Sequence, residues 1–582
     1  DPANLAPREA LLFVGVTDAE RTWEDFKKTN GYRAYQDTQL RESVAEWNVM
    51  SGAMKKLREK IATALETSPD ALKNPFQGPL AFYVTGEPGR EEPGMVLVAT
   101  IGDRALLEQY VSTATKRMRA VASNVETVDA GADQILVFHN KPASPANDNV
   151  AEEDELNFDA DDELSSPMDD LGNVDKMIDT FFSADSLPEE LALCQGRERF
   201  YLASTAADIR AALRLSESES MSSHEDRRTM DRLLAPLGPI RMVVNWPRIF
   251  ELLEAEGRRR GNDDFNVTRK VVGTECMQSF IGHMRIADDG FDGILDGYQL
   301  TRGTCSGVMD ILRMENRATA PGPQVGAETL LFGSLNLDVS GFLDKVEKIL
   351  RQQDPAQADM MKASLESAPL PGGEETINLR REFFDHLKPP VTFGIDLRPP
   401  YQPDEIRVLL SFGSSNAEAI TRTMGKNPLT TQREQRGATV FFSPMIPIET
   451  TATSDRFMIG SAPAIDSALS GTPNRPLNET SSFRTVAKAV PEDSWMTVFI
   501  ETPTLYRALL AYQKHKEALT ANPMDVAKGL VAGLIEGFQG ELPDDPAMVE
   551  RLIRYQAPSI FTLSTTTEGI RITLATPAAS GS

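Results

Sequence analysis

The chain has 582 residues and a formal net charge of −26, because 86 aspartates and glutamates outnumber 60 lysines and arginines. Hydrophobic residues make up 41% and charged residues 25%, close to the averages of globular domains and enough to build a core. A surface this acidic repels phosphate backbones and anionic headgroups, so we expect no nucleic-acid or membrane-surface binding. No stretch approaches the roughly 18 consecutive apolar residues that indicate a transmembrane segment.

A unit made of an apolar strand, a capping residue and an amphipathic helix recurs along the chain. Its predicted strands lie at 11–16, 240–244, 330–335 and 495–500. The predicted caps that follow them are Thr17-Asp18, Asn245, Asp338 and Thr502. Such side chains accept hydrogen bonds from the unpaired N–H groups of a first helical turn.

Other elements recur in the same order. The predicted strands at 79–84 and 95–102 correspond to those at 390–395 and 406–413, and 199–204 corresponds to 456–461. Hairpins are predicted to turn at Asp289-Gly290 and at Glu568-Gly569. We therefore expect an α+β protein of two tandem duplicated halves, 1–320 and 321–582, each a mostly antiparallel sheet backed by helices.

The first half is predicted to carry an acidic insertion at about 140–187. Between positions 142 and 175 there are twelve acidic residues and no lysine or arginine, which is typical of a flexible surface loop. Its weak candidates for calcium ligands are Asp159, Asp161, Asp162 and Glu163. Leu164 stands where an EF-hand loop needs glycine, and the twelfth position lacks the bidentate glutamate, so a solvated loop is favoured over a calcium site.

The chain contains three cysteines, Cys194, Cys276 and Cys305. This number is odd and too small for a disulfide framework, so the sequence favours three buried thiols. Cys276 and Cys305 flank a predicted hairpin and could pair, which the sequence leaves open. The absence of a CxxC motif and of a Cys/His cluster argues against structural zinc.

The sequence holds no recognisable catalytic motif. The HExxH, GxSxG and P-loop patterns are absent, and the five histidines are scattered. Dispersed paired carboxylates remain open, because their spacing exists only in the folded protein. Gly529, Gly533 and Gly537 repeat every four residues, which favours close helix packing within the chain or a contact between two copies.

The opening of the chain carries a family resemblance. Its segments at 6–16, at 23–29 (Trp-Glu-Asp-Phe-Lys-Lys-Thr) and at 35–37 resemble those of uncharacterised secreted bacterial proteins common in planctomycetes. The resemblance implies a domain of unknown function, offers no catalytic residues, and implies an extracytoplasmic location. With the chain starting at Asp1 and not at methionine, we expect a removed signal peptide and a periplasmic or secreted protein.

These observations favour a non-catalytic, extracytoplasmic interaction or scaffold protein without a cofactor. A protein partner would meet the cleft between the halves or the acidic insertion. Two alternatives stay open. One is a hydrolase that uses dispersed carboxylates in that cleft, with its acidic or histidine side chains in one deep pocket. The other is a solute- or lipid-binding protein with an apolar cavity.

Overall fold

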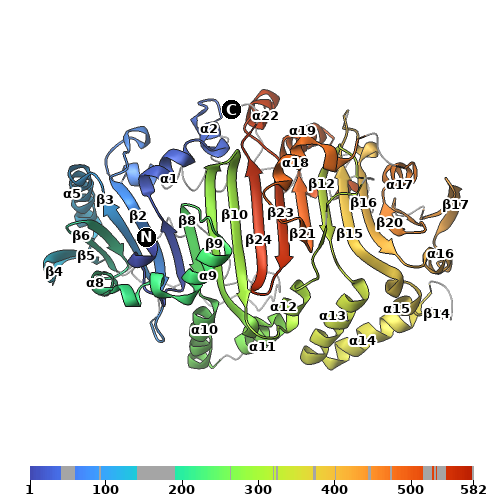
Figure 1. The fold of residues 1–582 in the computed structure, drawn as a ribbon, viewed down its shortest axis with the longest axis horizontal. Helices are drawn as coiled ribbons and strands as arrows, with labels where there is room; N and C mark the ends of the chain where they lie inside the picture. The colour runs from blue at the N-terminus through green and yellow to red at the C-terminus, as the bar shows by residue number, and fades with distance from the viewer. Residues whose placement is uncertain are drawn as a thin grey trace, which may run out of the picture. The chain divides into compact units, whose positions relative to one another are not determined.

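The computed structural model describes most of the chain, and Figure 1 labels many of its helices and strands. The described residues are 1–40, 59–63, 65–90, 93–139, 190–261, 264–318, 320–322, 325–370, 375–399, 401–443, 447–471, 475–515, 527–529, 532–533 and 545–579. The fold is α+β, as predicted, and every strand pairing among these residues is antiparallel.

The chain forms two compact units that do not coincide with the predicted halves. Unit 1 comprises Asp1–Asp25, Val44–Ala235 and Pro239–Asn245; unit 2 comprises Phe26–Ser43, Pro236–Gly238 and Trp246–Ser582. The β9–β10 hairpin, which belongs to the first predicted half, pairs with β24 near the end of the chain. The repeat boundary at 320 stays a prediction about the sequence.

The sheet of unit 1 has the strand order β8-β1-β2-β3-β7-β6-β5-β4. The strands are β1 (Leu12–Val16), β2 (Phe76–Thr85), β3 (Gly94–Ile101), β4 (Asn124–Ala130), β5 (Asp133–His139), β6 (Glu190–Gln195), β7 (Arg199–Ala203) and β8 (Ile240–Val244). The helices are α1 (Ala19–Phe26), whose last residue belongs to unit 2, α5 (Arg104–Val121), α8 (Ala206–Arg214) and α9 (Glu225–Leu233).

Two helices of unit 1 cover opposite faces of this sheet. Leu107 of α5 packs with Leu193 and Leu202, which lie opposite each other on β6 and β7. Neighbouring strand residues point to opposite faces, so Ala203 and its cross-strand partner Val96 lie on the face that α8 contacts. Unit 1 thereby buries both faces of its central strands.

The main sheet of unit 2 has the order β9-β10-β24-β23-β22-β12-β15-β16-β20-β19-β18-β17. The strands are β9 (Met277–Asp288), β10 (Phe291–Thr301), β12 (Thr329–Leu335), β15 (Leu387–Asp396), β16 (Arg407–Ser414), β17 (Thr431–Gln435), β18 (Ala438–Phe442), β19 (Glu449–Ala452), β20 (Arg456–Gly460), β22 (Met496–Ile500), β23 (Ser559–Thr565) and β24 (Gly569–Pro577). Two short pairs join β11 (Arg317–Ala318) to β21 (Asp493–Ser494) and β13 (Ala368–Pro369) to β14 (Thr376–Ile377).

Helices of unit 2 gather at the two ends of its strands, with α12, α13 and α14 at one end and α19 and α22 at the other (Figure 1). The helices are α2 (Asn30–Gln36), α10 (Trp246–Arg260), α11 (Asp264–Val272), α12 (Gly307–Leu312), α13 (Val339–Gln353), α14 (Pro355–Glu366), α15 (Leu379–Glu382), α16 (Ala417–Gly425), α17 (Ala462–Leu469), α18 (Ser481–Ala487), α19 (Thr502–Gln513) and α22 (Pro546–Ile553). None of the described helices has the length and apolar character needed to cross a bilayer.

The ten strands predicted from local sequence signals are all present, with ends that differ by at most about three residues. Asp18 accepts a hydrogen bond from the N–H of Arg21, as a capping residue should, and Asp338 precedes α13. The predicted cap Thr502 is wrong by one position, because α19 begins at Thr502 and Glu501 precedes it. The β9–β10 hairpin turns at Asp289-Gly290, where both residues have the positive φ that a tight hairpin requires.

The favoured prediction of three free thiols is wrong. Cys276 and Cys305 form a disulfide with a Cα–Cα distance of 5.1 Å. The turns of 3₁₀ helix before β9 and the segment before α12 bring the two residues together, a juxtaposition that sequence spacing could not fix. Disulfides persist mainly in oxidising compartments, so this bond is consistent with an extracytoplasmic protein.

Cys194 lies on β6, is fully buried and is a free thiol. Burial raises its pKa to about 11, with the nearby Asp133 carboxylate as a smaller cause. We expect iodoacetamide at pH 8 to label Cys194 far more slowly in the native protein than in urea, since only the thiolate reacts. Mass spectrometry over time measures this, and equal labelling rates would contradict the buried position.

The same pKa shift predicts how stability changes with pH. A raised pKa means that the folded state keeps the proton that the unfolded state loses, so the stabilisation from Cys194 is complete below the unfolded pKa. It is lost as the pH rises toward about 11.

The predicted acidic insertion at 140–187 lies outside the described residues, between β5 and β6. In unit 2 the strands β18 and β19 are joined by residues 443–448.

Candidate functional site

A cavity of about 340 Å³ opens in unit 1 between the β2–β3 strands and helix α8. This volume lies at the lower end of the range for small-molecule sites. Its lining combines apolar, aromatic and charged side chains: Pro7, Arg8, Glu9, Tyr83, Thr85, Val96, Asp208, Ala211, Ala212, Arg214, Leu215 and Glu219. The cavity is therefore a candidate binding site.

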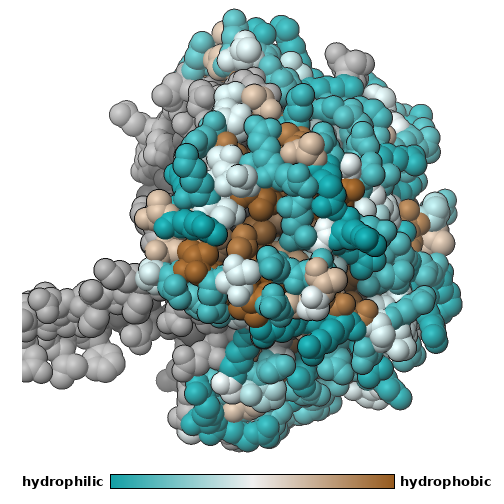
Figure 2. Space-filling view, turned by 90° about the vertical axis from the view of Figure 1, so that its left-hand side faces the viewer, coloured by the Kyte–Doolittle hydropathy of each residue, from teal (hydrophilic) through white to brown (hydrophobic). Residues whose placement is uncertain are grey.

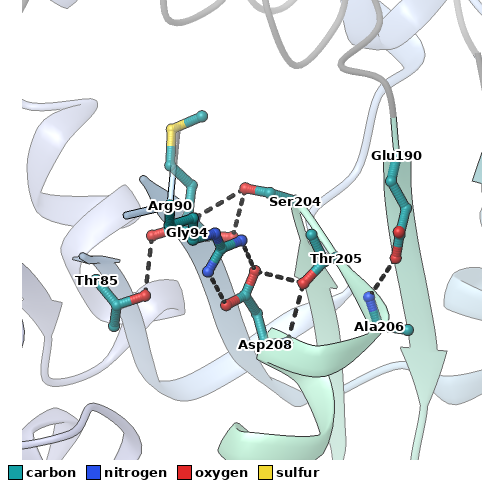
Figure 3. Close-up of polar contacts among 9 residues, drawn as sticks. Thr85, Arg90, Gly94, Glu190, Ser204, Thr205, Ala206 and Asp208 are labelled. Atoms are coloured by element: carbon teal, nitrogen blue, oxygen red, sulfur yellow. Dashed lines mark hydrogen bonds and ion pairs between the residues drawn. The ribbon is translucent and has the colours of Figure 1, made fainter. Parts of the chain in front are cut away.

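Asp208 is the buried acidic residue of this cavity, with 8% of its surface exposed. Its two carboxylate oxygens accept hydrogen bonds from Nη1 and Nη2 of Arg90 at 2.9 and 2.8 Å (Figure 3). Arg90 comes from the β2–β3 turn, 118 residues away. The bond to Asp208 is the main reason why the pKa of Arg90 is raised. Paired bonds of this kind are strong and fix the geometry of both groups.

The N-terminus of α8 holds Asp208 in place. The Thr205 hydroxyl caps the helix by accepting the N–H of Asp208 at 3.2 Å, and it donates to the Asp208 carboxylate at 2.7 Å. Glu190 on β6 accepts the N–H of Ala206 at 2.6 Å (Figure 3). Two carboxylates beside the first turn of a helix also interact favourably with its dipole.

Ser204 ties the end of β7 to the start of β3. Its hydroxyl accepts the N–H of Met95 at 2.8 Å, while its own N–H donates to the carbonyl of Met95 at 3.0 Å. On the neighbouring strand, Thr85 donates to the carbonyl of Gly94 at 3.3 Å (Figure 3). A side chain at Gly94 would collide with Asp208, Thr85 and Arg90, so the absence of a side chain there makes room for the ion pair.

Tyr83 on β2 is the buried aromatic residue in the lining, and its pKa is raised well above its ordinary value. Burial is the largest cause, followed by the charge of Asp208. The phenol therefore stays protonated at physiological pH. Tyr83 can offer a ligand a hydrogen bond, but it is poorly suited to act as a base.

Charged side chains at the cavity rim are solvent-exposed. The carboxylate of Glu219 accepts a hydrogen bond from the Ser216 hydroxyl, which lowers the pKa of Glu219. Arg8 and Glu9 face each other at 3.9 Å, too far apart and too exposed to be strongly coupled. Figure 2 shows the side of the molecule that carries α5, α8 and β4, where apolar side chains gather in a central patch among hydrophilic ones.

The calcium candidates Asp159, Asp161, Asp162 and Glu163 lie outside the described residues. Within the described part of the chain, no cluster of His, Cys, Asp or Glu has a metal-binding arrangement. Gly529 and Gly533 are both exposed, and among the described residues nothing lies within 4 Å of a side-chain carbon added at either. Gly537 is not described. Close helix packing within the chain and a contact between two copies both stay predictions.

Sequence reasoning missed the Arg90–Asp208 pair. One local signal was readable, because Thr205 followed three residues later by Asp208 resembles a capping box at a helix start. The partner Arg90 sits in a turn far away in sequence, and no local pattern indicates it.

Comparisons with known proteins identify no family. No family model matches the chain, and no curated protein matches it. A search of solved structures finds a likeness to crystal form I of TP0453, at 11% sequence identity over 45% of this chain and 94% of that chain. The TM-score is 0.21, too low to support an argument about fold or function.

Proposed function

We propose that this protein is a non-catalytic, extracytoplasmic interaction protein, and that the unit 1 cavity receives a small group of its partner. The observation that carries the proposal is the bidentate Arg90–Asp208 pair. The carboxylate that a hydrolase would use as an acid or base is bound by a guanidinium and by Thr205. A fixed charge pair of this kind suits recognition better than proton transfer.

We infer further that the two halves arose by duplication of one α+β unit. The order β8-β1-β2-β3-β7-β6-β5-β4 in unit 1 has a counterpart in β22-β12-β15-β16-β20-β19-β18-β17 of unit 2. The serine at the end of the fifth strand supports the same inference. Ser461 accepts the N–H of Val408 and donates its own N–H to the carbonyl of Val408, as Ser204 does with Met95.

The cavity residues differ between these counterparts. Tyr83 and Gly394 occupy matching register positions, since each lies opposite a buried phenylalanine, Phe13 and Phe332 respectively. Asp208 is the third residue of α8, and the third residue of α17 is the apolar Ala464. A duplicated scaffold with one specialised copy explains why the ion pair lies in unit 1.

The compartment is the second part of the proposal. The Cys276–Cys305 disulfide supports an oxidising environment, and the resemblance of the first hundred residues to secreted bacterial proteins points the same way.

The proposal can be tested by a substitution that fills the mouth of the cavity, with the amount of crosslinked protein–partner complex as the measured quantity. Ala211 lines the cavity from an exposed position on α8, so Ala211→Trp should block it without disturbing the core. Ala105, exposed on α5 and not part of the lining, provides the matched control Ala105→Trp. We expect the crosslinked complex from native extracts to decrease at least about tenfold for Ala211→Trp only.

An unchanged complex with Ala211→Trp would contradict the role of the cavity. Hydrolysis of ester, peptide or glycoside reporter substrates that Asp208→Asn abolishes would replace the proposal with the hydrolase alternative.

A further inference from the structure

The sheet of unit 2 has a buried polar row where an apolar one is expected. Across eight neighbouring strands, the residues in register are all polar, and all except the half-buried Thr392 are buried: His283, Asp296, Thr573, Thr562, Thr497, Ser334, Thr392 and Ser411. Part of their hydrogen bonding is internal. Thr573 and Arg571 both donate to the carboxylate of Asp296, and His283 accepts the N–H of Gly238.

One residue further along each strand, on the opposite face, the row is apolar throughout. It runs across nine strands: Met284, Leu295, Leu574, Phe561, Val498, Gly333, Phe393, Leu410 and Ile459. Leu574 is 40% exposed and Phe393 37%, and the other side chains are only half-buried. Sheets with one solvated face ordinarily place the polar residues outside. At this pair of rows the alternation is reversed, although the next row on the buried face, which includes Phe332, Phe499 and Ile560, is apolar.

Helices contact the rows on either side of this apolar row. Leu331 and Ile500 lie two positions from the apolar row, toward one end of the strands. They pack against Leu505 and Leu509 of α19. Leu335, Met496 and Leu563 lie two positions from the apolar row, toward the other end of the strands. They pack with Met309 and Leu312 of α12. The flanking rows are four residues apart, about 13 Å at the rise of an extended strand. The apolar row therefore forms a floor between two helix-covered rows. At its β16 and β20 end, Leu410 and Ile459 themselves pack against a core cluster that includes Ile420 of α16.

The row offers no polar partner to a ligand. None of its side chains carries an N–H or O–H donor or an oxygen acceptor. In sheet order, each strand from β10 through β24, β23, β22, β12, β15 and β16 to β20 has its backbone hydrogen-bonded to a neighbouring strand on both sides. The ring of Phe393 lies over Gly333, where a side-chain carbon would approach it at 1.7 Å, so the floor stays continuous at this glycine. A ligand that lies along the row finds no hydrogen-bond partner there, so the part of the ligand in contact with the row must be apolar.

We propose that this row binds the hydrocarbon chain of a long-chain fatty acid, lying across the strands. The seven strands from β9 to β15 in sheet order lie about 4.8 Å apart and span about 29 Å, enough for an extended long acyl chain. An extended peptide would leave its backbone N–H and C=O groups unsatisfied against this surface. The site lies in unit 2, so the proposal goes beyond the function proposed for unit 1 and does not depend on it.

The exposed area argues against a second copy of the chain as the occupant. A large side chain has about 200 Å² of surface, so eight of them at these exposures present well below the roughly 800 Å² per partner of a stable interface. The row carries no charged side chain, so an occupant would bind it through apolar contact.

The direct test uses the full-length protein and palmitic acid carrying a diazirine near its methyl end. After irradiation, peptide mass spectrometry should place adducts on β24, β23, β22 or β15, and excess unlabelled palmitic acid should abolish them. Adducts spread over the surface, or confined to elements outside this face, would overturn the proposal.

Variants give the second readout. Leu574→Asp introduces a charge at an exposed strand position and should weaken binding of a fluorescent NBD-stearate at least about tenfold. The matched control is Met360→Asp on α14, where the side chain is 67% exposed and outside the row, with unchanged affinity expected. Equal affinities of the two variants would overturn the proposal, as would a wild-type dimer in light scattering that Leu574→Asp converts to monomer. If Leu574→Asp fails to fold, the diazirine adducts on the wild-type protein decide.

Discussion

Replacing Asp208 by alanine is expected to lower the free energy of unfolding by about 3–5 kcal/mol, because it leaves the Arg90 guanidinium partly buried without its partner. The pair is well shielded, with 9% of the Asp208 side chain and 27% of the Arg90 side chain exposed. Urea denaturation followed by circular dichroism, with the change in midpoint checked against the slope, measures the loss.

A double variant separates the ion pair from simple packing. Arg90→Met with Asp208→Leu replaces both charges by apolar groups of similar size, and its stability should lie within about 1 kcal/mol of the wild type. The exposed pair Arg8–Glu9 is the control, since Arg8→Ala should change stability by less than about 0.5 kcal/mol. If Asp208→Ala were as mild as Arg8→Ala, the geometry assigned to the cavity would be wrong.

Removing the disulfide has the second large expected effect. Cys276 and Cys305 are 29 residues apart, and a closed loop of this length contributes about 3–4 kcal/mol by restricting the unfolded chain. The Cys276→Ser/Cys305→Ser variant should therefore unfold at a lower urea concentration, and dithiothreitol should have the same effect on the wild type.

The thiol inventory provides the control for this experiment. A thiol assay on the unreduced, unfolded wild type should find one free thiol per chain, that of Cys194. Three free thiols in protein isolated from its native compartment would contradict both the bond and the oxidising location inferred from it.

The local elements could be predicted from the sequence because their signals lie within a few residues of each other. The strand at 240–244 and the helix after Asn245 follow from apolar alternation and a polar cap, and both are present as β8 and α10. The hairpin at Asp289-Gly290 follows from the turn preference of that dipeptide.

Long-range relations could not be predicted in the same way. Arg90 and Asp208 belong to a turn and a helix that meet only in the folded sheet. Leu574 sits in an ordinary alternating strand, and no local pattern indicates that it is 40% exposed in the folded protein. The pairing of Cys276 with Cys305 likewise depends on backbone geometry rather than on spacing.

The unit 1 cavity and the apolar row of unit 2 differ in the kind of ligand that their side chains can bind. The unit 1 cavity is lined by Asp208, which Arg90 fixes in place, and by a protonated tyrosine, and these groups can orient a polar group of a ligand. The apolar row of unit 2 has no polar side chain and selects by shape and hydrophobicity. Separate variants, Ala211→Trp and Leu574→Asp, address the two sites independently.

Site-specific photocrosslinking is the most direct test of whether the unit 1 cavity binds a partner without chemical conversion. Benzoylphenylalanine would replace Arg214, an exposed residue of α8 in the cavity lining, and, as the control, Ala105 on α5. We expect one discrete adduct from position 214, none from position 105, and an unmodified ligand or partner in the recovered adduct. Absence of an adduct at position 214, or recovery of a cleaved product, would contradict binding without conversion at this cavity.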